Sequence, residues 1–244
     1  MPGYEGGGGL SLGRRNSMGL RRIAAIVAIG VAVLVLLPYL IVPFYRFVMP
    51  VSMPILWRYA TGARVERIVV PLSHIAPALR LTVIGAEDGS FCHNPGIDLS
   101  EIRAALRQSD DNLDEARGAS TITQQTAKNL FLWQGRSFVR KALEIPLALW
   151  MTLVLPKPRI LEIYLNIAEW GPTGQFGAEA GARYAFGKPA ADLTLYQAAE
   201  LAAVLPNPQE RSARNPTGLV RRLAGVYVRR AEDFSNLDAC VRGP

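Results

Sequence analysis

Apolar positions along the chain follow helical rather than strand spacing, and one apolar run stands apart. The run at 23–45 contains 23 residues without a charge. Because a helix of about 20 residues crosses the ~30 Å hydrocarbon layer, this run predicts a transmembrane helix. From residue 68 onward the alternating pattern of strands is nearly absent. The pattern predicts a mainly α domain at 68–244, preceded by a membrane-proximal connector at 46–67.

Capping residues and prolines indicate where the helices of this domain begin and end. Thr121 with Gln124, and Thr194 with Gln197, have the spacing of capping boxes. Ser137 is placed to cap a long helix, and Pro156 ends it. These signals predict helices at about 74–86, 100–116, 121–132, 137–155, 158–168 and 195–205. The stretch 174–186 is rich in Gly and Ala, which predicts close packing.

The residues before the apolar run predict its orientation. A glycine-rich tail at 1–22 is expected to be disordered, and its basic residues are Arg14, Arg15, Arg21 and Arg22. The positive-inside rule places this tail in the cytoplasm and the domain outside. A cleaved signal peptide is the alternative. The apolar run is longer than a typical signal core and no Ala-x-Ala site follows it, which favours an anchor.

Composition narrows the class of partner. The net charge is +7, which suggests nucleic acid, an acidic membrane or a phosphorylated substrate. Aromatic residues are few and do not alternate with basic ones, so nucleic acid is disfavoured. Cys92 and Cys240 could pair, but two cysteines make no disulfide framework and do not settle the compartment.

Three polar stretches carry candidate chemistry. Glu87 and Asp88 end an apolar helix, where partial desolvation raises a carboxyl pKa toward the range of a general base. The alternative is a carboxylate bonded to backbone amides. The 121–132 helix places Gln124 and Lys128 on one face, which suits either a polar ligand or a solvated surface.

The third stretch is a basic cluster that abuts an apolar helix. Arg136, Arg140, Lys141 and Glu144 come directly before the apolar residues 145–155. The structural interpretation is a surface salt bridge that contributes under about 1 kcal/mol to stability. The functional interpretation is a site for an amphiphile with an anionic head, because Arg and Lys bind phosphate well.

Four motifs in this order resemble the peptidoglycan glycosyltransferase family, which also occurs as a module of bifunctional penicillin-binding proteins. They are Glu87-Asp-Gly-Ser-Phe91, Gly118-Ala-Ser-Thr-Ile-Thr-Gln-Gln-Thr-Ala-Lys-Asn129, Arg140-Lys-Ala-Leu-Glu144 and Ile160-Leu-Glu-Ile-Tyr-Leu-Asn166. The resemblance covers about residues 68–208. It implies a lysozyme-like fold with a membrane-dipping lobe around 99–120. The transpeptidase signatures Ser-x-x-Lys and Lys-Thr-Gly do not occur, which implies the monofunctional form.

The resemblance also implies an activity in cell wall biogenesis and cell shape. The enzyme would polymerise lipid II into β-1,4 glycan strands, with inversion, from an undecaprenyl pyrophosphate donor. It would sit in the bacterial inner (cytoplasmic) membrane with its catalytic domain on the periplasmic side. Membrane lipids are expected partners, and other cell wall synthesis proteins are further candidate partners. Nucleic acid is not expected.

Residue roles carry over by motif. Glu87 matches the catalytic base, and Glu144 matches a second carboxylate that orients either the basic groups or a metal. Lys128 and Arg136 match cations that bind pyrophosphate. The other substrate-binding candidates are Ser120, Gln124, Asn129, Arg140 and Lys141. A divalent cation (Mg²⁺ or Mn²⁺) would assist departure of the pyrophosphate, but no ligand cluster demands one.

The sequence departs from the family pattern at one position, and two other functions compete with the glycosyltransferase interpretation. The family usually has His two residues before the glycine of the first motif, where this chain has Asn94 before Gly96 and its histidine at His93. Asn supplies a hydrogen bond but no proton. A wall-degrading muramidase or lytic transglycosylase would also use two carboxylates, but it has no need of cations around a leaving group. A non-catalytic assembly factor would not need the intact motifs.

Overall fold

The computed structural model describes residues 12–100, 103, 120–135, 137–233, 236 and 238–242. The chain divides into two compact units, Met1–Ile41 and Val42–Pro244. In the first unit, the described residues form one helix, α1 (Leu12–Ile41). Among the described residues, Arg21–Arg46 is the one stretch long and apolar enough to cross a membrane. This is consistent with a single-pass anchor.

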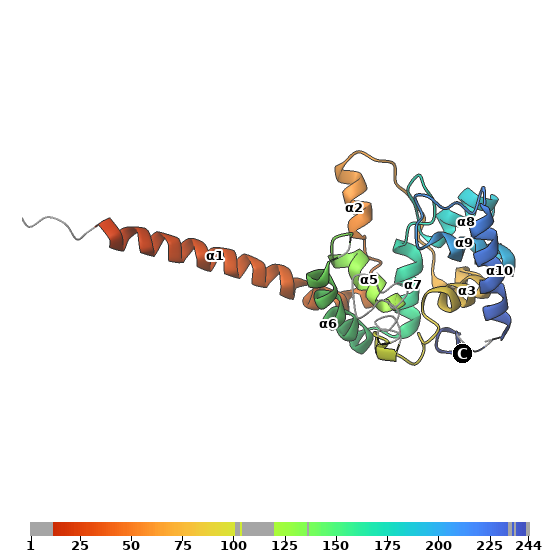
Figure 1. Ribbon diagram of the computed structural model, residues 1–244, viewed down its shortest axis with the longest axis horizontal. Helices are drawn as coiled ribbons and strands as arrows, with labels where there is room; N and C mark the ends of the chain where they lie inside the picture. The colour runs from red at the N-terminus through yellow and green to blue at the C-terminus, as the bar shows by residue number, and fades with distance from the viewer. Residues whose placement is uncertain are drawn as a thin grey trace, which may run out of the picture. The chain divides into compact units, whose positions relative to one another are not determined.

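The second unit is built from helices, as the apolar spacing predicts (Figure 1). Its α-helices are α2 (Met53–Ala60), α3 (Pro77–Glu87), α5 (Ile122–Phe131), α6 (Phe138–Val154), α7 (Lys157–Ile167), α8 (Ala178–Phe186), α9 (Leu195–Val204) and α10 (Gly218–Asp233). Short 3₁₀ turns lie at Val42–Arg46, Leu72–His74, Ala190–Asp192 and Ala239–Val241. The strands of the described residues are β1 (Glu66–Arg67) and β2 (Gln175–Phe176), a parallel pair with Glu66 opposite Gln175. The mainly α prediction is confirmed.

Side-chain caps explain where α5, α6 and α9 begin. Thr121 and Thr194 each close a full capping box before α5 and α9, and the Ser137 hydroxyl caps α6. Helices α2, α8 and α10 were not predicted. The helix predicted at 100–116 and the membrane-dipping lobe around 99–120 lie almost entirely outside the described residues.

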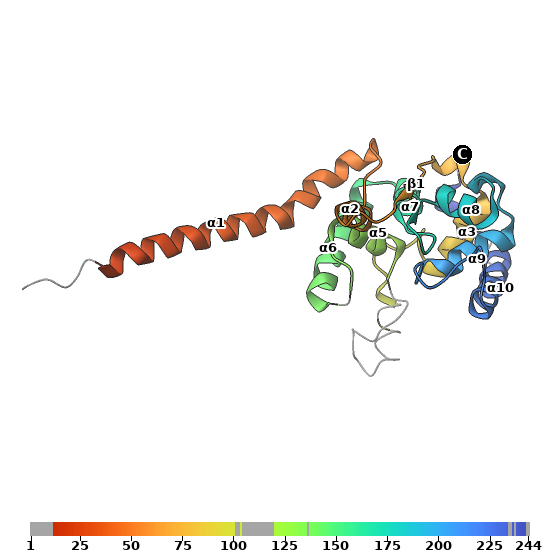
Figure 2. The same ribbon diagram turned by 90° about the horizontal axis from the view of Figure 1, so that it is seen from above.

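The helices of the second unit form two groups, on either side of α7 in both views (Figures 1 and 2). Helices α3, α9 and α10 pack against one another, and α5 packs against both α6 and α7. Helix α8 follows β2 and contacts α7. Its Gly181 fits directly over Trp170, where an added Cβ would lie 2.5 Å from the Trp170 Cβ. The close packing predicted for the Gly/Ala-rich stretch is therefore present.

A disulfide joins the end of the chain to the loop that follows α3. Cys92 and Cys240 are bonded across 148 positions, and the Cys240 backbone N–H also lies 3.2 Å from the Cys92 sulfur. The pairing that the sequence left open is thus present. The bond fixes the C-terminal 3₁₀ turn beside the loop that carries Asp88.

We expect the double substitution Cys92→Ser and Cys240→Ser to lower the free energy of unfolding by about 2–5 kcal/mol, because the bond restricts the unfolded chain. Thermal unfolding followed by tryptophan fluorescence would measure the loss in detergent-solubilised protein. Reducing agent should destabilise the wild type to a similar extent and leave the double variant unchanged. An unchanged melting temperature of the reduced wild type would contradict the expectation.

Candidate functional site

Glu87 is the last residue of α3, a helix whose other residues are largely buried. Pro77 lies in the first turn, and Leu79, Val83 and Ile84 are fully buried. The helix ends at Glu87, which reaches across to α5: its Oε2 accepts a hydrogen bond of 2.9 Å from Gln125 Nε2. The hydrophobic face of α3 therefore anchors a carboxylate at the edge of the core.

Burial raises the pKa of Glu87 above its ordinary value. The hydrogen bond from Gln125 and the charges of Lys128 and Arg211 oppose this rise, while neighbouring Asp88 adds to it. The result is a carboxyl group with increased basicity that still has cations near it. This is the balance that a general base requires.

Asp88 fixes the relation between α3 and α5. It is buried, and its carboxylate accepts from the Ile122 backbone N–H at 3.0 Å and from Asn94 Nδ2 at 2.8 Å. Asn94 in turn accepts from the Gly96 backbone at 3.0 Å and from Lys157 Nζ at 3.1 Å. The side chain at the usual histidine position therefore organises the loop through hydrogen bonds alone.

Helix α5 presents three polar side chains to a groove. Gln125, Lys128 and Asn129 line it, whereas Gln124 is fully buried and closes the capping box with Thr121. The expectation that Gln124 lines the cleft therefore differs from its observed position. Its neighbour Gln125 takes that place, because the residue at the third position of a capping box turns back toward the helix end.

The basic residues of α6 gather around Glu144. Arg140 pairs with one carboxylate oxygen of Glu144, and Lys141 Nζ lies 3.3 Å from the other. Lys141 Nζ also donates to Ser120 Oγ at 2.8 Å. Glu144 is buried, so its charge serves the two cations rather than solvent. Arg136 lies outside the described residues.

This arrangement does not fit a metal site. Both oxygens of Glu144 already face cations. Among the described residues there is no group of three or more Asp, Glu, His or Cys side chains able to hold a metal ion. In the described part of the chain, the cations available to an anionic ligand are side chains, and Glu144 holds two of them, Arg140 and Lys141, in place.

Burial, and then neighbouring cations, lower the pKa values of two lysines. Burial, then Arg140, then Lys128 lower the pKa of Lys141 to about 8. The pKa of Lys128 is also lowered, by burial and by Arg140, while Glu87 acts in the opposite direction. A cluster of cations that repel one another has unmet positive charge, so it favours an anion.

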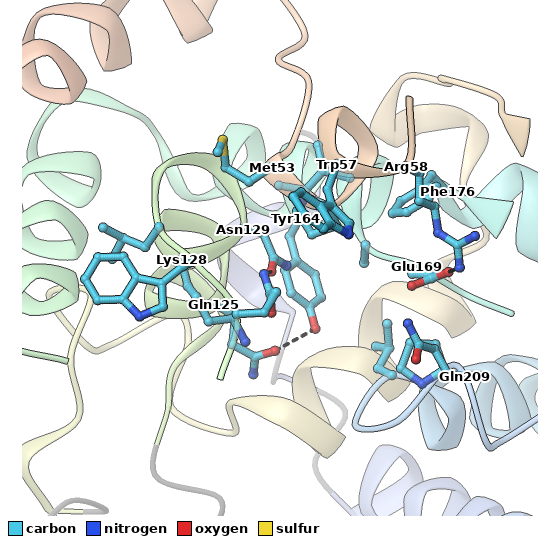
Figure 3. A pocket seen from close by; sticks show the side chains of 18 of the residues that line it. Met53, Trp57, Arg58, Gln125, Lys128, Asn129, Tyr164, Glu169, Phe176 and Gln209 are labelled. Atoms are coloured by element: carbon cyan, nitrogen blue, oxygen red, sulfur yellow. Dashed lines mark hydrogen bonds and ion pairs between the residues drawn. The ribbon is translucent and has the colours of Figure 1, made fainter. Parts of the chain in front are cut away.

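The groove has a volume of about 920 Å³ and runs between α2, α5, α7 and the loop after α9. Figure 3 shows its walls, with Lys128, Asn129 and Gln125 on one side and Arg58 and Glu169 on the other. Its apolar lining includes Met53, Trp57, Phe131, Trp133 and Phe176. A groove that combines cationic and other polar side chains with apolar ones suits a ligand with an anionic head and a lipid part.

Sequence reasoning missed several residues of this site. Gln125 lies between Glu87 and the fully buried Tyr164, whose hydroxyl donates to Gln125 Oε1 at 3.1 Å. Arg211 and Asn207 lie in the loop after α9, and both approach the site. The helical spacing of Tyr164 is that of a core residue, so the sequence did not indicate its contact with Gln125. The Leu-Pro-Asn-Pro run at 205–208 was the one available signal for this loop.

Comparisons with known proteins identify the family of this chain. The sequence model of a family described as "Transglycosylase" matches residues 56–231. The chain is 53% identical to the biosynthetic peptidoglycan transglycosylase of Nitrobacter hamburgensis over 91% of this chain and 98% of that protein. It is 56% identical to that of Rhodopseudomonas palustris strain TIE-1 (91% and 93%) and 45% identical to that of Agrobacterium fabrum (92% and 99%).

We expect anion binding at the α5–α6 cations to weaken as the pH rises through about 8, because Lys141 then loses its charge. Above that pKa the affinity for inorganic pyrophosphate should fall by about tenfold per pH unit, with proton uptake on binding. Isothermal titration in two buffers of different ionisation enthalpy would measure both.

Two lysine-to-arginine variants control this measurement. Lys141→Arg should reduce the dependence, because arginine stays charged and only Lys128, whose pKa is also lowered, still titrates there. Lys157→Arg should retain it, because Lys157 has a similar pKa of about 8 but bonds to Asn94, in the loop after α3. Pyrophosphate affinity that stays constant between pH 7 and 9.5 would contradict the assignment.

Proposed function

This chain belongs to the transglycosylase family, and we propose that Glu87 is the general base with which it polymerises lipid II into glycan strands. Family membership confirms the lysozyme-like helical fold and the glycosyltransferase class that the motifs predict. The hydrogen bond between Gln125 and Glu87 is the main support for the proposed residue roles. Gln125, which lines the groove beside Lys128, also holds the carboxylate of Glu87.

In the proposed reaction, Glu87 acts on the acceptor sugar. Glu87 takes the proton of the 4-hydroxyl of the acceptor's N-acetylglucosamine, and that oxygen attacks the anomeric carbon of the donor. The new C–O bond forms as the bond to pyrophosphate breaks, and the electron pair leaves with the diphosphate. Attack from the opposite face converts the α-linkage into a β-1,4 bond. The raised pKa of Glu87 suits proton removal at neutral pH.

The cations act on the other half of the reaction. Negative charge develops on the departing diphosphate, and fixed positive charge nearby lowers that barrier. Lys128, Arg140 and Lys141 supply it, and Glu144 holds the last two in position. A hydrolase that breaks glycosidic bonds needs two carboxylates near the sugar. The second carboxylate here is occupied by cations, which favours transfer from a diphosphate over hydrolysis.

The proposed location is the inner membrane, with the domain on the periplasmic side. Helix α1 supplies the anchor, and the arginines before it favour a cytoplasmic N-terminus. The Cys92–Cys240 disulfide supports the same orientation, because such bonds persist in the periplasm and are rare in the cytosol. The apolar run and the disulfide are independent observations that favour one arrangement.

Membrane lipids are the second proposed partner. Several large apolar side chains of the catalytic unit are at least half exposed, on the connector and on α6. They are Phe47, Val48, Trp57, Phe138, Val139 and Leu153. Exposed apolar side chains of this kind favour contact with a bilayer interface. Contact there would keep the groove close to substrates whose lipid chains stay in the membrane.

We expect Glu87→Gln to lower glycan polymerisation from purified lipid II by a factor of at least about 10², because the amide keeps the shape but cannot take a proton. Gel analysis of products from labelled lipid II would measure it, with thermal unfolding as the check on folding. Glu66→Gln, a change at a carboxylate of β1, is the matched control and should leave the rate unchanged. Rapid polymerisation by Glu87→Gln would remove Glu87 from the role.

We expect a reporter enzyme that is active only in the periplasm to work when fused after residue 244 and to fail when fused before residue 1. The positive-inside arrangement is the reason. Activity measured in intact cells would decide the orientation. The reverse pattern, or activity at neither end, would contradict it.

A further inference from the structure

The hydroxyl of Tyr164 has no part in the proposed reaction, yet it lies one side chain away from the base. Tyr164 of α7 is 1% exposed, and its hydroxyl donates to Gln125 Oε1 at 3.1 Å (Figure 3). The other end of the same amide donates to Glu87 Oε2 at 2.9 Å. The three side chains come from α7, α5 and α3, so the chain of bonds joins three helices.

The chemistry of the partners decides which way the Gln125 amide faces. Its nitrogen lies within reach of two groups, the Glu87 carboxylate at 2.9 Å and the Ser120 backbone carbonyl at 3.3 Å. A carboxylate and a carbonyl only accept hydrogen bonds, so the NH₂ end must face them. The oxygen end then needs a donor, and the Tyr164 hydroxyl is that donor. Burial, followed by the charges of Glu87 and Asp88, raises the pKa of Tyr164, which keeps its proton in place.

We propose that Tyr164 is a positioning residue for the general base, and that its hydroxyl holds the Gln125 amide in the one orientation that donates to Glu87. The proposal rests on the proposed role of Glu87. Without the hydroxyl, the buried amide oxygen has no donor, which is costly. The amide then shifts toward another donor, and its hydrogen bond to Glu87 is weakened or lost.

Loss of this hydrogen bond raises the pKa of Glu87. A donated hydrogen bond stabilises the charged carboxylate, so its loss raises the pKa of Glu87. The other groups that face Glu87 stay in place: Asp88 on its own segment, Lys128 on α5, Arg211 after α9 and Tyr227 on α10. A general base works as the carboxylate, above its pKa. A higher pKa therefore moves the acid limb of the pH–rate profile to higher pH.

The test is the pH dependence of kcat and KM for full-length Tyr164→Phe with lipid II. We expect the acid limb of kcat to move up by about 0.5–1 pH unit, the size of shift that loss of one hydrogen bond produces. Below that limb the rate should fall by about 3- to 10-fold, and it should return close to the wild-type rate at higher pH, with little change in KM. A uniform loss at all pH values, or an unmoved limb, would overturn the proposal.

Two further variants separate positioning from general damage. Tyr227→Phe removes another hydroxyl near Glu87 that has no hydrogen bond to Gln125 in the described part of the chain, and it should leave the acid limb in place. Gln125→Ala should move the limb by itself. Adding Tyr164→Phe to Gln125→Ala should move it no further, because Tyr164 acts through the amide. A further shift in the double variant would show that Tyr164 acts on Glu87 by another route.

The outcomes also distinguish this inference from the proposed function. If the wild type does not polymerise lipid II, or if Glu87→Gln remains fully active, the role of Glu87 fails first. If the wild type polymerises lipid II, Glu87→Gln is inactive and Tyr164→Phe keeps the wild-type acid limb, the positioning role alone fails. Thermal unfolding of each variant identifies any loss that comes from unfolding rather than from the site.

Discussion

A base and a group of cations have to share one small site here without neutralising each other. If Glu87 paired directly with Lys128 or Lys141, its basicity would be lost and the cations would have less charge for a leaving group. The structure separates the two tasks. A neutral amide, Gln125, is the hydrogen-bond partner of Glu87, while a different carboxylate, Glu144, takes the ion pairs of Arg140 and Lys141. The rest of the fold keeps these two sets of contacts apart.

Asp88 keeps these two sets of contacts apart by joining the end of α3 to the start of α5. Its carboxylate binds the first turn of α5 through the Ile122 N–H, while its own backbone ends α3. The end of one helix is thereby tied to the start of the other. Gly96, on the same loop, packs so closely on α6 that an added Cβ would lie 2.5 Å from the Ala148 carbonyl oxygen. One short loop thus sets the relative positions of α3, α5 and α6, the helices that carry the base, the groove and the cations.

Residues whose role is set within one helix were predictable, and those whose role depends on distant partners were not. The capping boxes at Thr121 and Thr194 follow from spacing alone, and both are present. The Glu144 contacts follow from i,i+3 and i,i+4 spacing. The inward turn of Gln124 follows from the same capping box, but the contact of Gln125 with Glu87 depends on how α5 is rotated against α3. That rotation is set by the Asp88–Ile122 bond, 34 residues apart, which no local pattern shows. The Cys92–Cys240 pairing is non-local for the same reason.

Two lysines show why a perturbed pKa cannot by itself assign a function. Lys141 and Lys157 both have a pKa of about 8, with burial as the main cause. The next contributions differ in sign, because Arg140 and Lys128 lower the pKa of Lys141 further, whereas Asp88 raises that of Lys157. Lys157 lies over the Phe91 ring and bonds to Asn94, so the chain already occupies it. Lys141 also has partners, Glu144 and Ser120, but it belongs to a group with excess positive charge. It is that excess, rather than the lowered pKa, that calls for an anionic ligand.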